Sequence, residues 1–396
     1  MERAELALWL RLTLTPGIGN ETARRLLASF GLPYTIFQQS GTALRQVISD
    51  KLAQALAHEP DGLAQQVERT WEWLQAVDSD QPADSARAIL TLADSRYPPA
   101  LLETADPPLV LYLLGAAHVV GPDGPNAPLA LDPGIAIVGS RNPTPQGATN
   151  ARQFARALAE HGLSIVSGLA VGVDGAAHEG ALDSGATKAG WPVTIAVVGT
   201  GLDRVYPRRH HDLARRIASH GLLVSEYPIG TPPLAANFPR RNRIIAALSQ
   251  GTLVVEAALQ SGSLITARLA VEQGRDVFAI PGSIHSPQSR GCHALIRQGA
   301  KLVESAQDVL EELKIPVLQF AAEREYSGTG VPDAPQRDLA DGPLLQALGF
   351  DPVGLDALQA RTGLETAHLQ AQLMALELAG QVARLPGGLF QRIAQG

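Results

Sequence analysis

Residues 135–147, IAIVGSRNPTPQG, run from an apolar strand-like segment through a tight turn into the start of a helix. Gly139, Ser140 and Arg141 form the turn, and the helix is expected to begin near Pro145. A turn at a helix N-terminus points backbone N–H groups at an anion, and an arginine adds a bidentate phosphate donor. The dinucleotide fingerprint GxGxxG is missing. The turn therefore predicts either an anion site or an ordinary strand–helix connection.

Further apolar runs of strand length follow, namely LSIVSG, VTIAVVG, LLVSE, TLVVE and DVFAI, and helix-length segments separate most of them. Continuous apolar strands that alternate with helices predict a parallel sheet covered on both faces. We therefore expect an α/β domain with a mostly parallel sheet over residues 81–315. Ligands of open α/β sheets bind outside the carboxyl ends of the strands, so the turns at those ends are candidate binding segments.

The segments that flank the sheet have other patterns. Residues 1–80 place apolar side chains at helical spacing, which predicts a helical domain. Residues 316–341 are polar with Gly and Pro and predict a linker. Residues 342–396 contain three helix-like pieces and then a hairpin signal, in which Pro-Gly-Gly separates two alternating runs. Three helices followed by a hairpin are the outline of a winged-helix domain.

The composition bounds the class of protein. The chain has 396 residues, a net charge of −7 and 45% hydrophobic residues, which is enough for two or three domains. Cys292 is the single cysteine, which excludes a disulfide framework and a cysteine-built zinc site and favours a reducing compartment. The first apolar stretch contains charges and predicts neither a signal peptide nor a membrane anchor. We therefore expect a cytoplasmic protein with no membrane partner.

Hydroxyl and glycine residues gather at the other predicted strand ends and at the helix starts that follow them. Together with the first turn they form a rim of amide and hydroxyl donors, and such a rim suits phosphates. These residues are Ser167, Gly168, Gly199, Ser261, Gly262 and Ser263.

Asp174 and His178 lie four residues apart, hence on one face of a predicted helix. An acid–base pair or a metal pair is conceivable for these two types of side chain. A metal site would need a third ligand, and no candidate presents itself. We therefore predict no metal, and we favour a helix cap at Asp174 and a buried hydrogen bond at His178.

The segment RRHH, residues 208–211, opens the helix after the third strand. A basic run at a helix start opposes the helix macrodipole. This local conflict hints at an anionic partner, although a solvated helix face is the ordinary interpretation.

The stretch NFPRRNRIIAALSQGTLVVEA, residues 237–257, places Phe238 beside Arg240, Arg241 and Arg243. An aromatic side chain in a basic groove suits single-stranded nucleic acid, because every base has a π-face that can stack. In the alternative interpretation, Phe238 belongs to the core and one or more of the arginines pair with an acid, either Glu226 or Glu256. We expect at least one such pair.

Seven motifs stand in order between about residues 135 and 303, and together they resemble the DNA-processing protein A family (DprA, also called Smf). The motifs are VGSRNPTPQG, SGLAVGVDGAAHEGAL, GTGLDRVYP, SEYPIGTPP, NFPRRNRIIAALSQGTLVVEA, SGSLITARLAVEQGRDVFAIPG and GCHALIRQGA. The combination is highly specific. The resemblance implies the layout of the longer members, with a helical N-terminal domain, an extended Rossmann-like domain and a C-terminal winged helix.

The resemblance also implies a function. Members of the family bind and protect incoming single-stranded DNA in natural transformation and help to load the RecA recombinase, typically as dimers and without known catalytic turnover. We therefore expect a homodimeric DNA-binding protein that is not an enzyme and has no cofactor. By similarity, the residues that bind the strand would be Gly139, Ser140, Arg141, Ser167, Gly168, Gly199, Phe238, Arg240, Arg241, Asn242, Arg243, Ser261, Gly262 and Ser263.

The N-terminal stretch LTLTPGIGNETARRLLASFG resembles a helix-hairpin-helix motif. In that interpretation Gly17 and Gly19 aim backbone amides at a phosphate, with Arg24 nearby. In the alternative, the glycines form a plain turn between the helices of a SAM-like bundle.

A second class of function is a nucleotide hydrolase on the same sheet. GTLVVEAALQSGS is loosely similar to the signature of the nucleoside-monophosphate phosphoribohydrolases. Glu256 would then be the catalytic acid or base, assisted by Asp174 or His178. The full Pro-Gly-Gly-x-Gly-Thr run is absent, and a mononucleotide pocket does not need a cluster of phenylalanine and arginines. These two features favour the DNA-binding interpretation.

Overall fold

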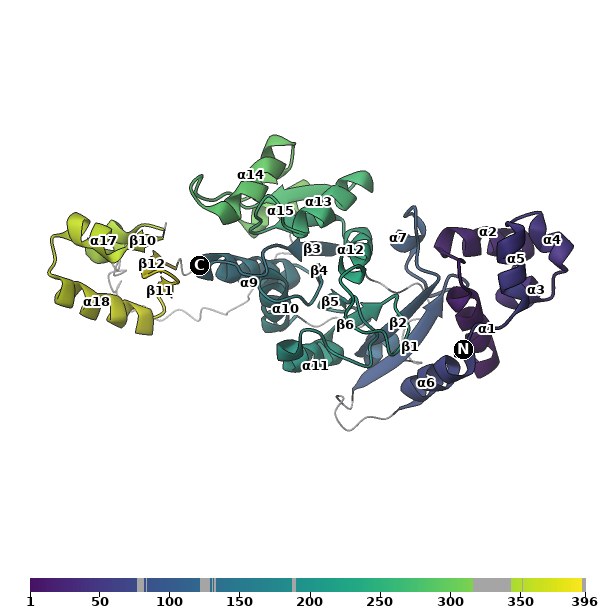
Figure 1. The fold of residues 1–396 in the computed structure, drawn as a ribbon. Helices are drawn as coiled ribbons and strands as arrows, with labels where there is room; N and C mark the ends of the chain where they lie inside the picture. Colours follow the sequence, from purple (N-terminus) through teal and green to yellow (C-terminus); the bar gives the residue numbers. More distant parts are fainter. Residues whose placement is uncertain are drawn as a thin grey trace, which may run out of the picture.

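The computed structural model describes residues 1–76, 82, 84–121, 129, 131, 133–186, 190–315, 343–350 and 352–393. The first part of the chain is helical, as predicted (Figure 1). Its helices bury Leu6, Trp9, Leu10 and Leu26 in a common core. The helices are α1 (Arg3–Leu14), α2 (Asn20–Phe30), α3 (Pro33–Phe37), α4 (Gly41–Arg45), α5 (Asp50–Ala57) and α6 (Leu63–Gln75).

A nine-stranded sheet forms the centre of the molecule, with the strand order β1-β2-β6-β5-β4-β3-β7-β8-β9. The strands from β6 to β9 in this order are parallel, which confirms the predicted mostly parallel sheet, whereas β1 and β2 add an antiparallel edge. The strands are β1 (Ser85–Thr91), β2 (Val110–Ala116), β3 (Gly134–Val138), β4 (Ser164–Ser167), β5 (Thr194–Val197), β6 (Leu222–Ser225), β7 (Gly251–Val254), β8 (Asp276–Ala279) and β9 (Lys301–Leu302).

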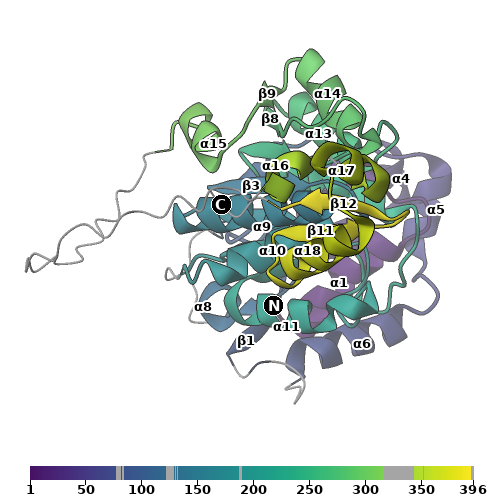
Figure 2. The same ribbon diagram turned by 90° about the vertical axis from the view of Figure 1, so that its left-hand side faces the viewer.

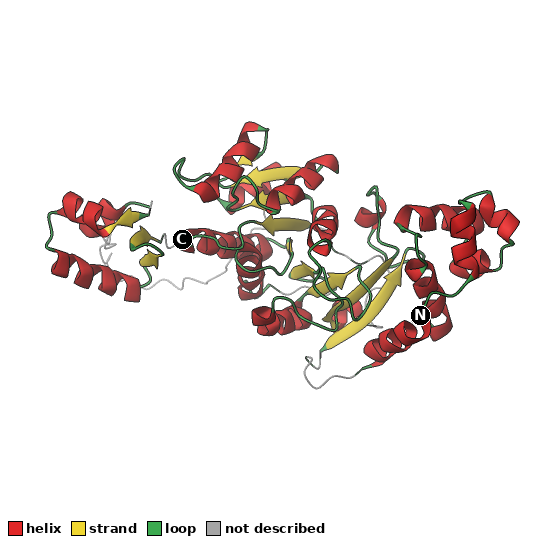
Figure 3. Ribbon diagram, in the orientation of Figure 1, coloured by secondary structure: helices red, strands yellow, loops and turns green. Residues whose placement is uncertain are grey.

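Helices cover both faces of the sheet, which explains why its strands are continuously apolar. On β3, Ile135 and Ile137 pack on the side of α9, α10 and α15, whereas Ala136 and Val138 pack on the side of α12, α13 and α14. Figure 3 shows the alternation of strand and helix, and in Figure 2 α9 and α10 lie together on one side. The helical segments are α7 (Pro99–Leu102), α8 (Ala117–Val120), α9 (Pro145–Glu160), α10 (Val173–Asp183), η1 (Arg208–His210), α11 (His211–His220), α12 (Asn237–Ala247), α13 (Ser263–Glu272), η2 (Pro287–Ser289), α14 (Arg290–Arg297) and α15 (Ala306–Glu312).

The direction of winding reverses between β3 and β7, which are hydrogen-bonded neighbours in parallel register. From β3 the chain proceeds through β4, β5 and β6 on one side, and from β7 it proceeds through β8 and β9 on the other. The connections that leave these two strands therefore diverge, and a crevice opens at their carboxyl ends. The fold thus places the turn after β3 opposite the turn after β7.

The C-terminal part has three helices and a small three-stranded sheet, which confirms the predicted winged helix. Strands β11 and β12 pair antiparallel across the predicted Pro-Gly-Gly turn, where Gly387 and Gly388 have positive φ angles of 84° and 73°. The predicted linker, residues 316–341, lies outside the described residues. The elements are α16 (Pro343–Leu348), β10 (Val353–Gly354), α17 (Leu355–Thr362), α18 (Thr366–Leu378), β11 (Val382–Leu385) and β12 (Leu389–Arg392).

Candidate nucleic-acid interface

A cleft of about 750 Å³ lies at the carboxyl ends of β3 and β7, where the winding of the sheet reverses. The turn after β3 forms one wall, the segment Gln260–Ser263 before and at the start of α13 forms another, and α12 crosses between them. Most of the predicted DNA-binding residues line this cleft: Gly139, Ser140, Arg141, Phe238, Arg241, Asn242, Ser261, Gly262 and Ser263.

An arginine and two aromatic rings form a stacked surface along the cleft. The guanidinium carbon of Arg141 lies 6.0 Å from the centroid of the Phe238 ring. The ring of Tyr206 lies 5.6 Å from that of Phe238, centroid to centroid, with an interplanar angle of 34°. Arg141 is exposed and Tyr206 is 49% exposed, so both present free surface to a ligand. Aromatic faces beside a cation are what a single strand needs for stacking and charge neutralisation.

Tyr206 is a residue of this surface that the sequence analysis did not assign. It follows Val205 in a segment with no strand or helix of its own, far along the chain from Phe238. The available signal was a tyrosine two residues before the arginines that begin at Arg208. Its contact with Phe238 depends on how two separate strand ends converge, which a local pattern cannot show.

Arg241 lines the cleft but is only 5% exposed, because its guanidinium group is inserted between two strand ends. Its Nη1 donates to the carbonyl oxygen of Gly168 at 2.6 Å and to that of Val197, and its Nη2 lies 4.0 Å from Asp174 Oδ2. A Cβ on Gly168 would coincide with the guanidinium group. The glycine therefore makes room for Arg241 rather than for a ligand.

The protein surroundings shift the pKa values of both members of this buried pair. Burial lowers the pKa of Arg241, and the charge of Asp174 opposes that shift. Burial raises the pKa of Asp174, and Arg241 together with the Ala170 amide opposes it. Each charge therefore offsets the cost of burying the other, and either charge alone would destabilise the fold at this position.

Arg243 and Arg240 lie away from the cleft lining. Arg243 is half-buried and forms an ion pair with Glu226, and its Nε lies 3.4 Å from Asp106 Oδ2. This pair confirms the expectation that at least one arginine of the cluster would meet an acid. Arg240 is exposed. A DNA contact from either residue stays a prediction.

Ser167 and Gly199 lie beneath the cleft and hold its floor together. The Ser167 hydroxyl is fully buried and donates to the Ile137 carbonyl oxygen at 2.6 Å. The Gly199 carbonyl oxygen accepts a hydrogen bond of 3.0 Å from the Asn237 side-chain amide. Both residues therefore stabilise the strand ends from which the lining residues project, and contact of either with DNA stays a prediction.

Two serines and a glycine occupy the start of α13. The Ser261 and Ser263 hydroxyl oxygens lie 2.7 Å apart, and Gly262 is the N-cap residue. Ser263 already belongs to the first turn of this helix. The positive end of the α13 dipole and these hydroxyls face the same cleft as Arg141.

Glu256, the catalytic residue of the hydrolase alternative, forms structural hydrogen bonds within the protein. Its carboxylate accepts hydrogen bonds from the Thr144 amide at 2.9 Å and the Thr144 hydroxyl at 2.6 Å, at the start of α9. The position of a Cβ on Gly147 would coincide with this carboxyl group. Burial raises the pKa of Glu256, and the two bonds from Thr144 oppose that shift. The carboxylate therefore ties the end of β7 to α9, outside the cleft lining.

Asp174 and His178 do not act as a pair. Asp174 accepts from the Ala170 amide at 3.2 Å and so holds the loop before α10, which corrects the prediction that it caps that helix. His178 Nδ1 lies 2.7 Å from the Thr194 hydroxyl oxygen, which is the predicted buried hydrogen bond. Burial lowers the pKa of His178 to about 3, so the ring is neutral. Within the described residues, no group of three His, Cys, Asp or Glu side chains could hold a metal ion.

The N-terminal glycines lie in the connection between α1 and α2, as both interpretations of that stretch require. Gly17 has a φ of 82°, and Gly19 is the N-cap residue of α2. Arg24 is already engaged, because its Nη2 donates to the Ala105 carbonyl oxygen at 2.8 Å and its Nη1 lies 3.6 Å from Asp106 Oδ1. A phosphate contact at Gly17, Gly19 and Arg24 stays a prediction.

No helix in the described part of the chain has the length and apolar character needed to cross a membrane.

Comparison with known proteins identifies relatives over nearly the whole chain. Protein Smf of Escherichia coli is 42% identical over 357 residues, which cover 89% of this chain and 86% of the relative. Protein Smf of Synechocystis is 34% identical and covers 99% of this chain and 100% of the relative. The crystal structure of DNA processing protein A (DprA) from Streptococcus pneumoniae superposes with a TM-score of 0.61 at 35% identity, and covers 79% of this chain and 98% of that one.

Two family models match separate parts of the chain. The model described as DNA recombination-mediator protein A matches residues 88–314, which contain the whole cleft. The model described as the DprA winged helix domain matches residues 330–388. The chain therefore belongs to the DNA recombination-mediator protein A family, also known as DprA or Smf.

Proposed function

We propose that this protein binds single-stranded DNA in the cleft and acts as a mediator of DNA recombination, including the recombination that follows natural transformation. The observation that carries the proposal is the surface that exposed Arg141, exposed Tyr206 and half-buried Phe238 form beside the start of α13. Bases stack on the two rings, and the arginine and helix dipole neutralise phosphates. The family description and the name of the pneumococcal relative, DNA processing protein A, support this function.

The lining residues divide into three roles in this proposal. Arg141 and Phe238 contact the strand directly, and the hydroxyls of Ser140 and Ser261 bind phosphate oxygens. Arg241 positions α12 by holding two strand ends and contributes its charge from beneath the surface. In its finer parts, the proposal is that the protein is a homodimer in the cytoplasm and helps to load the RecA recombinase onto the bound strand.

The hydrolase alternative has less support. A catalytic carboxylate must reach the substrate, whereas that of Glu256 is occupied by the amide and hydroxyl of Thr144 and lies outside the cleft lining. Neither Asp174 nor His178 forms a hydrogen bond with Glu256 in the described part of the chain. We therefore infer a binding protein rather than an enzyme.

Fluorescence anisotropy of a labelled oligo-dT tests the proposal. Arg141→Ala should weaken binding and flatten its salt dependence, because one phosphate contact in a single strand contributes a slope of about 0.7. Phe238→Leu should cost about 1–3 kcal/mol per base that it stacks, whereas Phe238→Tyr should retain binding. Arg156→Ala removes an exposed arginine that pairs with Glu160 on α9 and serves as the charge-matched control.

Duplex DNA and AMP complete the experiment. Selective binding of the single strand that depends on Arg141 and Phe238 supports the proposal. Wild-type protein that ignores oligo-dT but binds or cleaves AMP in a Glu256-dependent way would overturn it. In that case the hydrolase becomes the better description of the site.

A further inference from the structure

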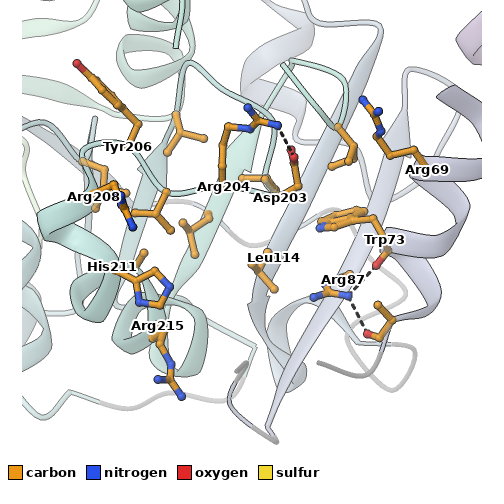
Figure 4. Close-up of a pocket in the computed structure, with 18 of the residues that line it drawn as sticks. Arg69, Trp73, Arg87, Leu114, Asp203, Arg204, Tyr206, Arg208, His211 and Arg215 are labelled. Atoms are coloured by element: carbon orange, nitrogen blue, oxygen red, sulfur yellow. Dashed lines mark hydrogen bonds and ion pairs between the residues drawn. The ribbon is translucent and has the colours of Figure 1, made fainter. Parts of the chain in front are cut away.

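A second basic cavity shares Tyr206 with the cleft and has a volume of about 1040 Å³. Its walls come from α6 and β1 on one side and from η1, α11 and the segment that contains Tyr206 on the other (Figure 4). Five arginines and two acids line it, although the whole chain has a net charge of −7. The arginines are Arg69, Arg87, Arg204, Arg208 and Arg215, and the acids are Glu72 and Asp203.

Two of the five arginines are engaged within the protein. Arg204 pairs with Asp203 at 2.7 Å, and Arg87 donates to the carbonyl oxygens of Trp73 and Ala76 at 2.8 and 2.7 Å (Figure 4). Partial burial of Asp203 favours its neutral form, but Arg204 and the Gly230 amide outweigh this and hold its pKa below the ordinary value. This acid therefore stays ionised and is already neutralised by its neighbour.

The other three arginines keep their charge free. Within the described part of the chain, no acid or hydrogen-bond acceptor pairs with the side chains of Arg69, Arg208 or Arg215, and all three are exposed. Arg208 and Arg215 lie on one side of the cavity, and Arg69 lies on the opposite side (Figure 4). Like charges that face one cavity repel each other, and an anion between them would remove the repulsion.

The walls of the cavity are held in place without a ligand. Gln66 on α6 donates to the Ile229 carbonyl oxygen at 2.8 Å, and Asp203 accepts from the neighbouring Gly230 amide at 2.8 Å. Both walls are therefore fastened to the same loop. The floor is apolar and contains Leu114 and Val198. A preformed basic site loses less free energy to ordering when its ligand binds.

We propose that this cavity is a second phosphate-binding subsite, which receives nucleotides of a bound strand after the strand has passed Tyr206. The proposal rests on the proposed function, because the strand reaches the cavity from the cleft. Free nucleotides carry the same phosphate chemistry and are the other possible source of the ligand. The basic run at residues 208–211, which opposes the helix dipole at the start of α11, has its explanation in this site.

A pair of double variants tests the subsite. Arg208→Ala with Arg215→Ala removes two of the free charges. Arg209→Ala with Arg216→Ala removes the same charge one residue further along, from side chains that do not line the cavity. Anisotropy would be measured with oligo-dT of about four and about sixteen nucleotides, the ordinary range of single-strand site sizes. Thermal unfolding midpoints establish that both variants fold.

The long oligonucleotide should bind about tenfold more weakly to the cavity variant. Its salt slope should fall by about 1.4, which corresponds to two phosphates of a single strand. The short oligonucleotide and the control variant should bind as the wild type does. Equal binding by both variants at both lengths, with binding still lost in Arg141→Ala, would overturn the subsite while the proposed function stands. An equal loss in both variants would also overturn it, because a general charge effect then explains the result.

Calorimetry with ATP identifies the source of the ligand. Binding of ATP that is lost only in the cavity variant would assign the site to free nucleotides, even if the wild type failed to bind oligo-dT and the proposed function fell. Failure of both oligo-dT and ATP to bind the wild-type protein would overturn the subsite together with the proposed function.

Discussion

Arg241 shows how a single residue can be central to the cleft without presenting its charge to solvent. Its guanidinium group meets the carbonyl oxygens of Gly168 and Val197 and the carboxylate of Asp174. It joins α12, which carries Phe238, to the ends of β4 and β5. These contacts of Arg241 therefore hold the Phe238 ring in place.

Replacement of this arginine should therefore damage stability before it damages binding. Arg241→Met should lower the free energy of unfolding by about 3–5 kcal/mol, because Asp174 is left as a buried charge without a partner. Urea unfolding measures this change. Arg240→Met, at the exposed neighbouring position, should change stability by less than about 0.5 kcal/mol. Similar values for the two variants would show that the buried pair contributes little.

The sequence could indicate which residue types gather at the cleft but not which of the arginines faces it. Arg141 follows a predicted strand end, and the cleft indeed contains it. Arg240, Arg241 and Arg243 lie within one short stretch, yet one is exposed, one is buried and one is paired with Glu226. The exposure and pairing of each arginine depend on carbonyl and carboxylate groups from distant parts of the chain, and the sequence around the arginines does not indicate those groups.

At the scale of elements, the parallel strands were predictable because each is a short apolar run bounded by turn residues. The antiparallel edge, β1 and β2, was not predicted, although β2 is buried along its whole length. Periodicity alone does not separate a continuous apolar run from a buried helical segment. Prolines on both sides of this region obscured the pattern further.

The junction between β7 and α9 gives a test at this scale. Glycine to alanine within a helix usually stabilises a protein by up to about 1 kcal/mol. Gly147→Ala should instead destabilise this one, because the new methyl group would displace the Glu256 carboxyl group from Thr144. Thermal unfolding measures the change. Gly41→Ala, in the first turn of α4 where a Cβ meets only ordinary contacts with Arg45, is the control and should not destabilise.

At the scale of the whole molecule, the cleft belongs entirely to the sheet region. Its lining residues lie between Val138 and Gln288, and the winged helix has a separate core that includes Leu348, Leu358 and Leu369. The hairpin of that part was predictable from its Pro-Gly-Gly turn. The sequence could not indicate whether the winged helix binds DNA or protein, because the charges of residues 342–396 are nearly balanced.

Removal of residues 316–396 should therefore leave the affinity for oligo-dT within about twofold of the wild type, because in the described part of the chain the cleft lining and the winged-helix core have no residue in common. Anisotropy titration of the shortened and full-length chains at one salt concentration measures the difference. Loss of binding in a shortened chain that still unfolds cooperatively would mean that the winged helix itself contacts the strand.

Asp106 receives arginines from two regions that are far apart along the chain. Arg24 reaches it from α2 and Arg243 reaches it from α12, the helix that carries Phe238. The N-terminal helices are thereby braced against the stacking helix through one shared carboxylate. A force or a partner protein that pulled on the N-terminal helices would be transmitted through Asp106 to the helix that carries Phe238. This contact is therefore a mechanical connection between one end of the protein and the proposed DNA-binding surface.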